Sequence, residues 1–125
     1  MSHFTTLKTK LTDKKILLKV LNTMNYGAVE NILLENPFNH DHEEVFVEIA
    51  VTRYVGFKRA EDGTLELVAE RDAWKESIPI ERFLETITQE YARQTVLGTV
   101  QEQGYTVVSE QKSVENTIEI VAEKW

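Results

Sequence analysis

The octapeptide Val45-Phe46-Val47-Glu48-Ile49-Ala50-Val51-Thr52 is the strongest structural signal in this chain of 125 residues. Every odd-numbered position carries a branched aliphatic side chain, whereas the even-numbered positions mix aromatic, charged, small and hydroxyl side chains. This period of two is that of a β-strand, whose successive side chains point to opposite faces of a sheet. We therefore predict a strand over residues 45–52.

A hairpin is predicted directly after this strand. Residues 54–60 and 64–71 both alternate apolar with polar side chains, and Glu61-Asp62-Gly63 separates them. Asp-Gly between two alternating runs is a strong hairpin signal, because both residue types tolerate the positive φ of a tight turn. Four further segments have strand composition and are predicted as strands: residues 4–11, 28–35, 105–110 and 117–124.

A first helix is predicted after residues 4–11. Thr12 and Asp13 are suitable helix caps, and the helix is expected to end at Gly27. Apolar residues then follow the i, i+3, i+4, i+7 spacing of one helix face at Leu17, Val20, Leu21 and Met24. This helix should pack one apolar face on the sheet and expose a lysine-rich face.

A second, longer helix is predicted to open at Ser77 and Pro79 and to end at Gly104. Its apolar stripe comprises Ile80, Phe83, Leu84, Ile87, Tyr91 and Thr95. Gly98 lies inside this helix, where glycine is unfavourable by about 1 kcal/mol relative to alanine. Close packing of backbone against backbone would explain its presence.

These elements predict an α+β fold, with a mainly antiparallel sheet and two helices on one face, built as a single domain over residues 1–125. The expected shared core comprises Leu17, Leu21, Val47, Phe83, Leu84 and Ile87. Residues 1–53 and 54–125 repeat the same order of elements. Two explanations stay open: a duplicated β-α-β-β unit, or a chance resemblance between amphipathic strands.

The composition excludes several classes of protein. The chain has no cysteine, which rules out disulfides, thiolate catalysis and Cys-based zinc or iron-sulfur sites. Its 14 Lys+Arg and 21 Asp+Glu give a net charge of -7, so we predict no nucleic-acid partner. No apolar run reaches the ~20 residues of a membrane span, and no signal peptide is visible. We therefore expect a cytoplasmic protein without a membrane partner.

Several short stretches, spread over almost the whole chain, carry a family resemblance. They are Met1-Ser2-His3-Phe4, Gly56-Phe57, Glu66-Leu67-Val68-Ala69, Trp74, Phe83-Leu84, Gln89, Tyr91-Ala92 and the closing residues 118–125. Their order and spacing resemble the hypothetical chloroplast open reading frame 35 family, also called domain of unknown function 1257. The resemblance implies a soluble cytoplasmic or stromal protein and a link to an AAA-type ATPase. Residues 36–44 depart from the family pattern, and the resemblance transfers no catalytic residue.

One cluster has the residue types of a metal site. His40-Asp41-His42-Glu43-Glu44 could converge on zinc or nickel if the loop curled, but a solvated loop between strands has the same composition. We favour the solvated loop, and thus predict no cofactor and no bound metal. His3 is expected at a sheet edge and not as a general base.

Catalytic machinery is not visible in the sequence. The carboxylates of Glu48, Glu66, Glu70, Glu119 and Glu123 fall at positions that strand alternation directs to solvent, so no acid–base pair is indicated. No phosphate-binding glycine loop, nucleophile elbow or His-Glu-x-x-His motif occurs. An enzyme is therefore the least favoured class.

Large aromatic residues give the remaining clue to function. Tyr54, Trp74 and Trp125 lie near the ends of predicted elements, where they either cap the sheet or meet a partner. We favour a non-enzymatic protein-interaction or adaptor module that uses these three side chains. The alternative is a small-ligand binding domain with a groove between two β-α-β-β units.

Overall fold

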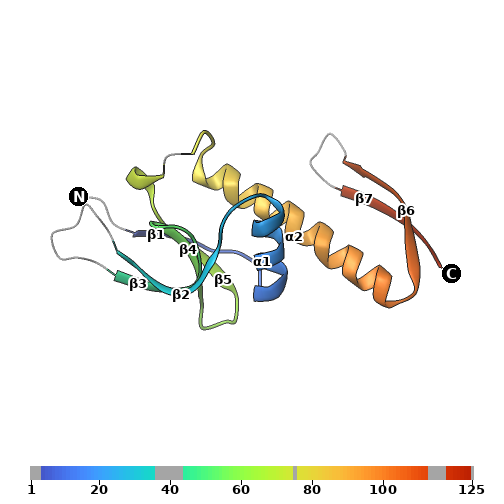
Figure 1. Ribbon diagram of the computed structural model, residues 1–125, viewed down its shortest axis with the longest axis horizontal. Helices are drawn as coiled ribbons and strands as arrows, with labels where there is room; N and C mark the ends of the chain where they lie inside the picture. The colour runs from blue at the N-terminus through green and yellow to red at the C-terminus, as the bar shows by residue number, and fades with distance from the viewer. Residues whose placement is uncertain (1–3, 36–43, 75, 113–117, 125) are drawn as a thin grey trace.

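The computed structural model describes residues 4–35, 44–74, 76–112 and 118–124 (Figure 1). In chain order its elements are β1 (Phe4–Leu7), α1 (Lys14–Thr23), β2 (Val29–Glu35), β3 (Glu44–Thr52), β4 (Val55–Arg59), β5 (Leu65–Glu70), the 3-10 helix η1 (Arg71–Ala73), α2 (Ile80–Glu102), β6 (Tyr105–Lys112) and β7 (Ile118–Lys124). The α+β class and the antiparallel sheet with two helices are confirmed.

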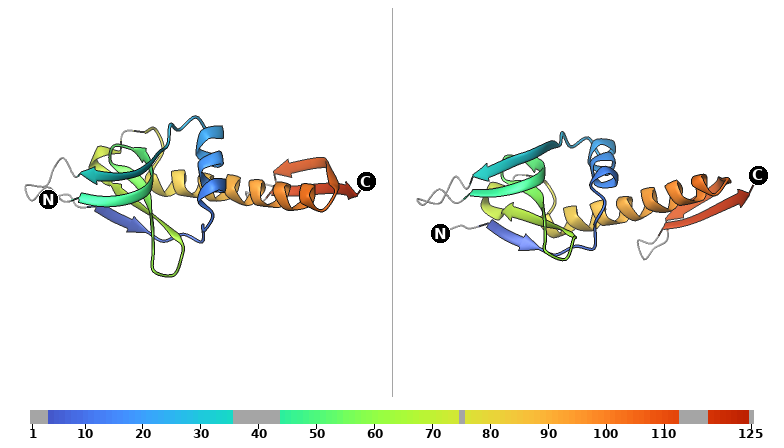
Figure 2. Two further views of the ribbon diagram at one scale, coloured as in Figure 1. Left: turned by 60° about the horizontal axis from the view of Figure 1, so that its bottom comes forward. Right: turned by 90° about the horizontal axis from the view of Figure 1, so that it is seen from below.

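Five strands form the main sheet in the order β1-β5-β4-β3-β2, with every neighbouring pair antiparallel. The predicted Glu61-Asp62-Gly63 hairpin joins β4 to β5, and Gly63 has the positive φ, 89°, that the turn requires. Strands β6 and β7 form a separate antiparallel sheet, so the expectation of one sheet for all strands is wrong. The 23 residues of α2 extend about 34 Å and carry this hairpin to the end of the helix remote from the main sheet (Figure 2).

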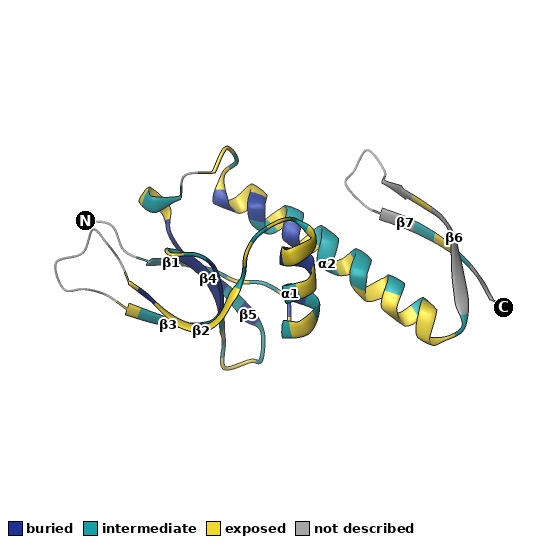
Figure 3. Ribbon diagram, viewed as in Figure 1, coloured by how far each residue is buried: buried dark blue, intermediate teal, exposed yellow. Residues whose placement is uncertain are grey.

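The main core lies between the five-stranded sheet and both helices, as predicted. Leu17 and Leu21 of α1 and Phe83 and Ile87 of α2 are fully buried in one cluster with residues of β3, β4 and β5. Leu84 packs against this cluster but is only partly buried. Buried residues on α2 are confined to its first turns, and exposure increases toward the end that carries β6 and β7 (Figure 3).

Val47 does not share the core of the helices. It packs in a second, smaller cluster whose buried members are Leu34, Val47 and Ala50. Ile49, two residues further along β3, belongs to the main core. The alternation of burial along β3 continues through Glu48 and ends at Ala50, which is buried between the buried Ile49 and Val51. In β2, Asn31 has a φ of 54°, which kinks that strand. The prediction for Val47 is wrong, because its buried neighbours are Leu34 of β2 and Ala50 of β3 and not residues of the helices.

The ends of α1 are set by side chains. Asp13 is the N-cap, and its carboxylate accepts hydrogen bonds from the backbone N–H groups of Lys15 and Ile16 at 2.9 and 3.2 Å. The backbone N–H of Asp13 donates to the hydroxyl of Tyr91, which ties α1 to α2. The helix ends at Thr23, and Asn25 takes the left-handed conformation expected of Gly27.

Two further expectations from the sequence are wrong. None of the residues that the structure describes comes within 4 Å of the position that a Cβ would occupy at Gly98, so their packing does not explain that glycine. Glu70, expected on a solvated face, is fully buried. Its carboxylate accepts a hydrogen bond from the backbone N–H of Ala73 at 2.9 Å and thereby caps η1, a local role that strand alternation does not reveal.

Candidate functional site

Strand β2 is an edge of the main sheet, so one side of its backbone has no neighbouring strand in the described structure. Its side chains are unusually apolar for an edge: Val29, Ile32 and Leu33 are 55%, 41% and 56% exposed. Leu33 lies opposite Phe46 of β3, which is also more than half exposed. An exposed apolar edge strand is a template for pairing with another chain, and proteins normally block such edges.

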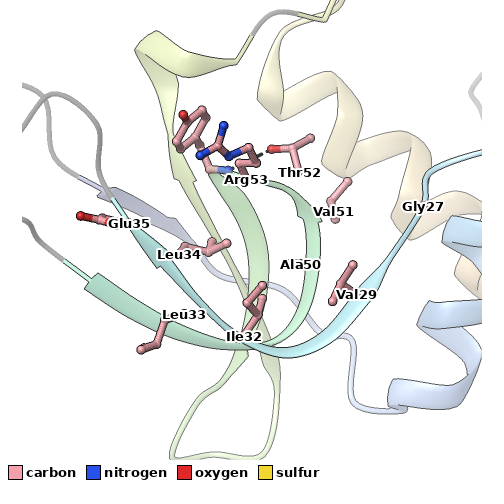
Figure 4. Close-up of a pocket in the computed structure, with 11 residues that line it drawn as sticks. Gly27, Val29, Ile32, Leu33, Leu34, Glu35, Ala50, Val51, Thr52 and Arg53 are labelled. Carbon is pink, nitrogen blue, oxygen red and sulfur yellow. Dashed lines mark hydrogen bonds between the residues drawn. The ribbon is translucent and has the colours of Figure 1, made fainter.

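A hollow of about 400 Å³ lies along this edge, and we call it the β2 groove. It lies between β2 and the turn Arg53–Tyr54 that joins β3 to β4, and the end of β3, which pairs with β2, forms part of its wall (Figure 4). Its walls are formed by Gly27, Val29, Ile32, Leu33, Leu34, Glu35, Ala50, Val51, Thr52, Arg53 and Tyr54. Most of these side chains are apolar, so the groove suits the side chains of an extended apolar segment.

A smaller hollow of about 240 Å³, the tryptophan pocket, is lined by the same turn. Its lining residues are Thr52, Arg53, Tyr54, Ala73, Trp74 and Glu76. Tyr54 and Trp74, predicted separately as binding residues, therefore line one pocket although they are 20 positions apart in the sequence. Because Thr52, Arg53 and Tyr54 line both hollows, one occupant could contact the β2 groove and the tryptophan pocket together.

The walls of the tryptophan pocket are held by internal contacts. The indole Nε1 of Trp74 donates to the backbone carbonyl of Ile78 at 2.6 Å, and the ring packs on Phe83 with centroids 5.0 Å apart. The carbonyl of Tyr54 accepts from the backbone N–H of Glu70 at 3.0 Å. Trp74 thus packs on the core with one part of its surface and lines the pocket with another. A pocket fixed in this way loses little conformational freedom on binding.

Arg53 is the one cation that lines both hollows. Its guanidinium lies over the ring of Tyr54, 5.7 Å from the ring centroid, a cation–π distance. Among the residues that the structure describes, it forms no ion pair, and neither Glu35 nor Glu76 binds it. Its hydrogen-bonding groups are therefore available to an occupant.

Tyr26 and Glu48 have shifted pKa values. Burial, and secondarily the negative charge of Glu76, raise the pKa of the Tyr26 hydroxyl. The hydrogen bond from Arg59 lowers the pKa of Glu48. Neither Tyr26 nor Glu48 lines the β2 groove or the tryptophan pocket, so neither shift provides the hollows with an acid or a base.

The other predicted site residues fall outside the described part of the chain. Trp125, His40 and His42 lie there, as does His3, so the binding role of Trp125 and the metal expectation stay predictions. Over residues 4–35, 44–74, 76–112 and 118–124, no group of three His, Cys, Asp or Glu side chains is placed to hold a metal. No helix within those ranges is long and apolar enough to cross a membrane.

Sequence reasoning missed the two main features of the site. The edge position of β2 depends on strand order, and the sequence of residues 28–35 does not indicate which strands pair with them. Its exposed Val29 and Leu33 could have been noticed, because they break the alternation that a half-buried strand requires. Apart from its charge, nothing in the sequence marked Arg53, the neighbour of the predicted Tyr54, as a binding residue.

Comparison with known proteins identifies the family of this chain but assigns no activity to it. A family model described as "Protein of unknown function (DUF1257)" matches residues 21–121. The chain is 26% identical to "Uncharacterized protein ycf35" of Cyanophora paradoxa and 27% identical to the protein of that name from Guillardia theta. Each of these alignments covers 100% of this chain and 98% of the relative. No solved structure matches the chain.

Proposed function

The chain belongs to the DUF1257 family of proteins of unknown function, and from this premise we propose that it is a protein-interaction module that binds an extended segment of a partner along β2. One observation carries the proposal: among the described strands β2 has a neighbour on one side only, and its exposed Val29, Ile32 and Leu33 border an apolar groove. Strand addition uses both parts of this surface. The backbone of β2 supplies hydrogen bonds, and the groove selects side chains.

Strand addition would also remove the energetic liability of this edge. Exposed apolar side chains on a strand edge favour aggregation unless a partner covers them. The partner's segment would continue the antiparallel order of the sheet beyond β2. The kink at Asn31 divides the edge, so the four residues from Ile32 to Glu35 form its longest regular stretch.

A small-ligand binding function is the second candidate. The volume of the β2 groove, about 400 Å³, is within the range of pockets that hold small molecules, and its walls are mainly apolar. A ligand would leave the backbone edge of β2 unpaired, which is why we rank it below a protein segment. Catalysis ranks last, because the described residues that line the two hollows include no histidine and no matched acid and base.

The partner and the compartment also belong to this proposal. An AAA-type ATPase, the class that the family resemblance implies, is the first partner to test. We place the protein in the cytoplasm or the plastid stroma, since a chain without cysteine needs no oxidising compartment. We also propose that residues 1–53 and 54–125 are pseudo-repeats of one domain, because β1-α1-β2-β3 and β5-α2-β6-β7 share one element order, with β4 as an additional strand of the second half.

The proposal is tested by changing the edge of β2. Leu33→Asp places a charge on the exposed edge, whereas Val121→Asp does the same on β7, where the side chain is similarly exposed at 52%. We expect affinity capture from the native host, read by cross-linking mass spectrometry, to lose its partner with Leu33→Asp and to keep it with Val121→Asp. Circular dichroism should show both variants folded. A partner retained by folded Leu33→Asp would refute binding along β2.

A further inference from the structure

The turn Arg53–Tyr54 separates the β2 groove from the tryptophan pocket and lines both. Any occupant that fills the two hollows must therefore pass over Arg53. Apart from Arg53 and one carboxylate in each hollow, the lining side chains are apolar, aromatic or uncharged. The charge of Arg53 is thus a central feature of the surface that the occupant covers.

Covering Arg53 has an electrostatic consequence. Its guanidinium is exposed and solvated in the free protein, with the Tyr54 ring below it and no ion-pair partner in the described structure. A bound segment would remove water from this cation, and a desolvated cation without an anion is strongly unfavourable. The planar guanidinium pairs best with a carboxylate, to which it can donate two parallel hydrogen bonds.

We propose that the segment bound along β2 carries a carboxylate that pairs with Arg53, between an apolar residue in the β2 groove and a second side chain in the tryptophan pocket. This inference rests on the proposed function, because it specifies the chemistry of the segment that β2 binds. An Asp or Glu side chain and a free chain terminus supply the same carboxylate chemistry. The net charge of -7 repels an acidic segment at long range, so the attraction has to come from direct contact with Arg53.

Two phage-displayed libraries of random dodecapeptides, selected against the full chain, test this inference. In one library the peptides end in a free carboxyl terminus, and in the other they are fused at both ends, so the two sources of carboxylate are separated. Selected peptides are then synthesised with the acid intact or replaced by its amide. Their affinities are measured by fluorescence anisotropy for the wild type, Arg53→Gln, Lys15→Gln and Leu33→Asp. Lys15→Gln is the matched control, since it removes one exposed positive charge on α1.

We expect selected peptides to share one carboxylate at a fixed distance from an apolar residue. Replacing it by the amide should weaken binding to the wild type at least 10-fold and change binding to Arg53→Gln less than 2-fold. Lys15→Gln should bind like the wild type. A different result would be peptides that bind the wild type and Arg53→Gln equally and yet lose affinity for Leu33→Asp. That result would refute the pairing of a carboxylate with Arg53 and would still support binding along β2. Failure to select any peptide sensitive to Leu33→Asp would overturn both.

Discussion

At the residue scale, Gly56 shows how tightly the sheet is packed where β3 meets β4. A Cβ at this position would lie 2.7 Å from the carbonyl oxygen of Ile49 and 2.9 Å from a methyl group of Val47. Both neighbours are in the sheet, and the nearer one is backbone, which cannot move cheaply. The side chain of any other residue would therefore displace β3 from β4.

Gly56→Ala should accordingly lower the free energy of unfolding by about 1–3 kcal/mol, the usual effect of overpacking a core. Urea unfolding followed by circular dichroism measures this change. Gly98→Ala is the control, because the space around Gly98 is open and alanine favours the helix. Equal stability of Gly56→Ala and the wild type would show that β3 and β4 are less closely packed than described.

Arg59 holds together the other end of the β3–β4 pair. Its Nε and a terminal nitrogen donate to the two carboxylate oxygens of Glu48 at 2.9 and 3.2 Å. The second terminal nitrogen donates to the backbone carbonyls of Thr12 and Gly63 at 2.7 and 2.8 Å. One side chain thus joins β3, the hairpin turn and the segment before α1.

The pKa of Glu48 predicts how this network responds to pH. The Arg59 hydrogen bond lowers the folded-state pKa of Glu48, so its stabilisation is complete above the unfolded-state pKa and disappears as the pH falls through the folded value. Glu48→Gln should cost about 1 kcal/mol at pH 7 and a decreasing amount below about pH 4.5. Urea unfolding at several pH values tests this, with the exposed Glu61→Gln as control. A cost that is the same at pH 3 and pH 7 would contradict it.

At the scale of elements, α2 is anchored by its first turns. Phe83 is fully buried and contacts both Tyr26 and Trp74, with ring centroids 5.1 and 5.0 Å away. Phe83→Ala should reduce the free energy of unfolding by about 3–5 kcal/mol, because an aromatic side chain is lost and a cavity remains. Thr88→Ala, an exposed change on the same helix, should alter it by less than about 0.5 kcal/mol. A loss below about 1 kcal/mol for Phe83→Ala in urea would contradict its position in the core.

The elements themselves were predictable because local patterns encode them. Alternation in residues 45–52 and the Asp62-Gly63 turn mark a strand and a hairpin whatever surrounds them. The separation of β6 and β7 from the main sheet was not predictable, since strand order depends on long-range pairing. Glu70 was misplaced because its role as a cap overrides the period of two. Val47 was misplaced because alternation does not reveal which cluster a buried side chain joins.

The candidate site was predictable only in part, because it too depends on long-range pairing of strands. Aromatic residues at element ends identified Tyr54 and Trp74, and these line one pocket. The groove beside them arises from an edge that no strand covers and from the turn at Arg53. Both are products of the assembled sheet, so they became visible only with its strand order.

At the scale of the whole molecule, the chain has two distinct ends. One carries the main sheet, and the other carries the β6–β7 hairpin on the exposed half of α2 (Figures 1 and 2). Among the residues whose exposure is described, the large exposed apolar side chains are Val29, Ile32, Leu33 and Phe46 on β2 and β3, and Val96 and Val121 on α2 and β7. Val29, Ile32 and Leu33 border the β2 groove, which makes the main-sheet end the stronger candidate for a partner.

A protein partner and a small ligand predict different compositions for the molecule isolated from its own host. Native mass spectrometry should show the chain in complex with another protein and with no metabolite or metal bound, if β2 binds a protein segment. Trp74→Ala and Tyr54→Ala should each weaken that complex, the former by about 2 kcal/mol or more, because both remove walls of the tryptophan pocket. Measuring below the unfolding temperature of each variant separates binding from the packing of Trp74 on Phe83. A monomer that retains a tightly bound metabolite would favour the ligand-binding function instead, and the groove beside β2 would be its site.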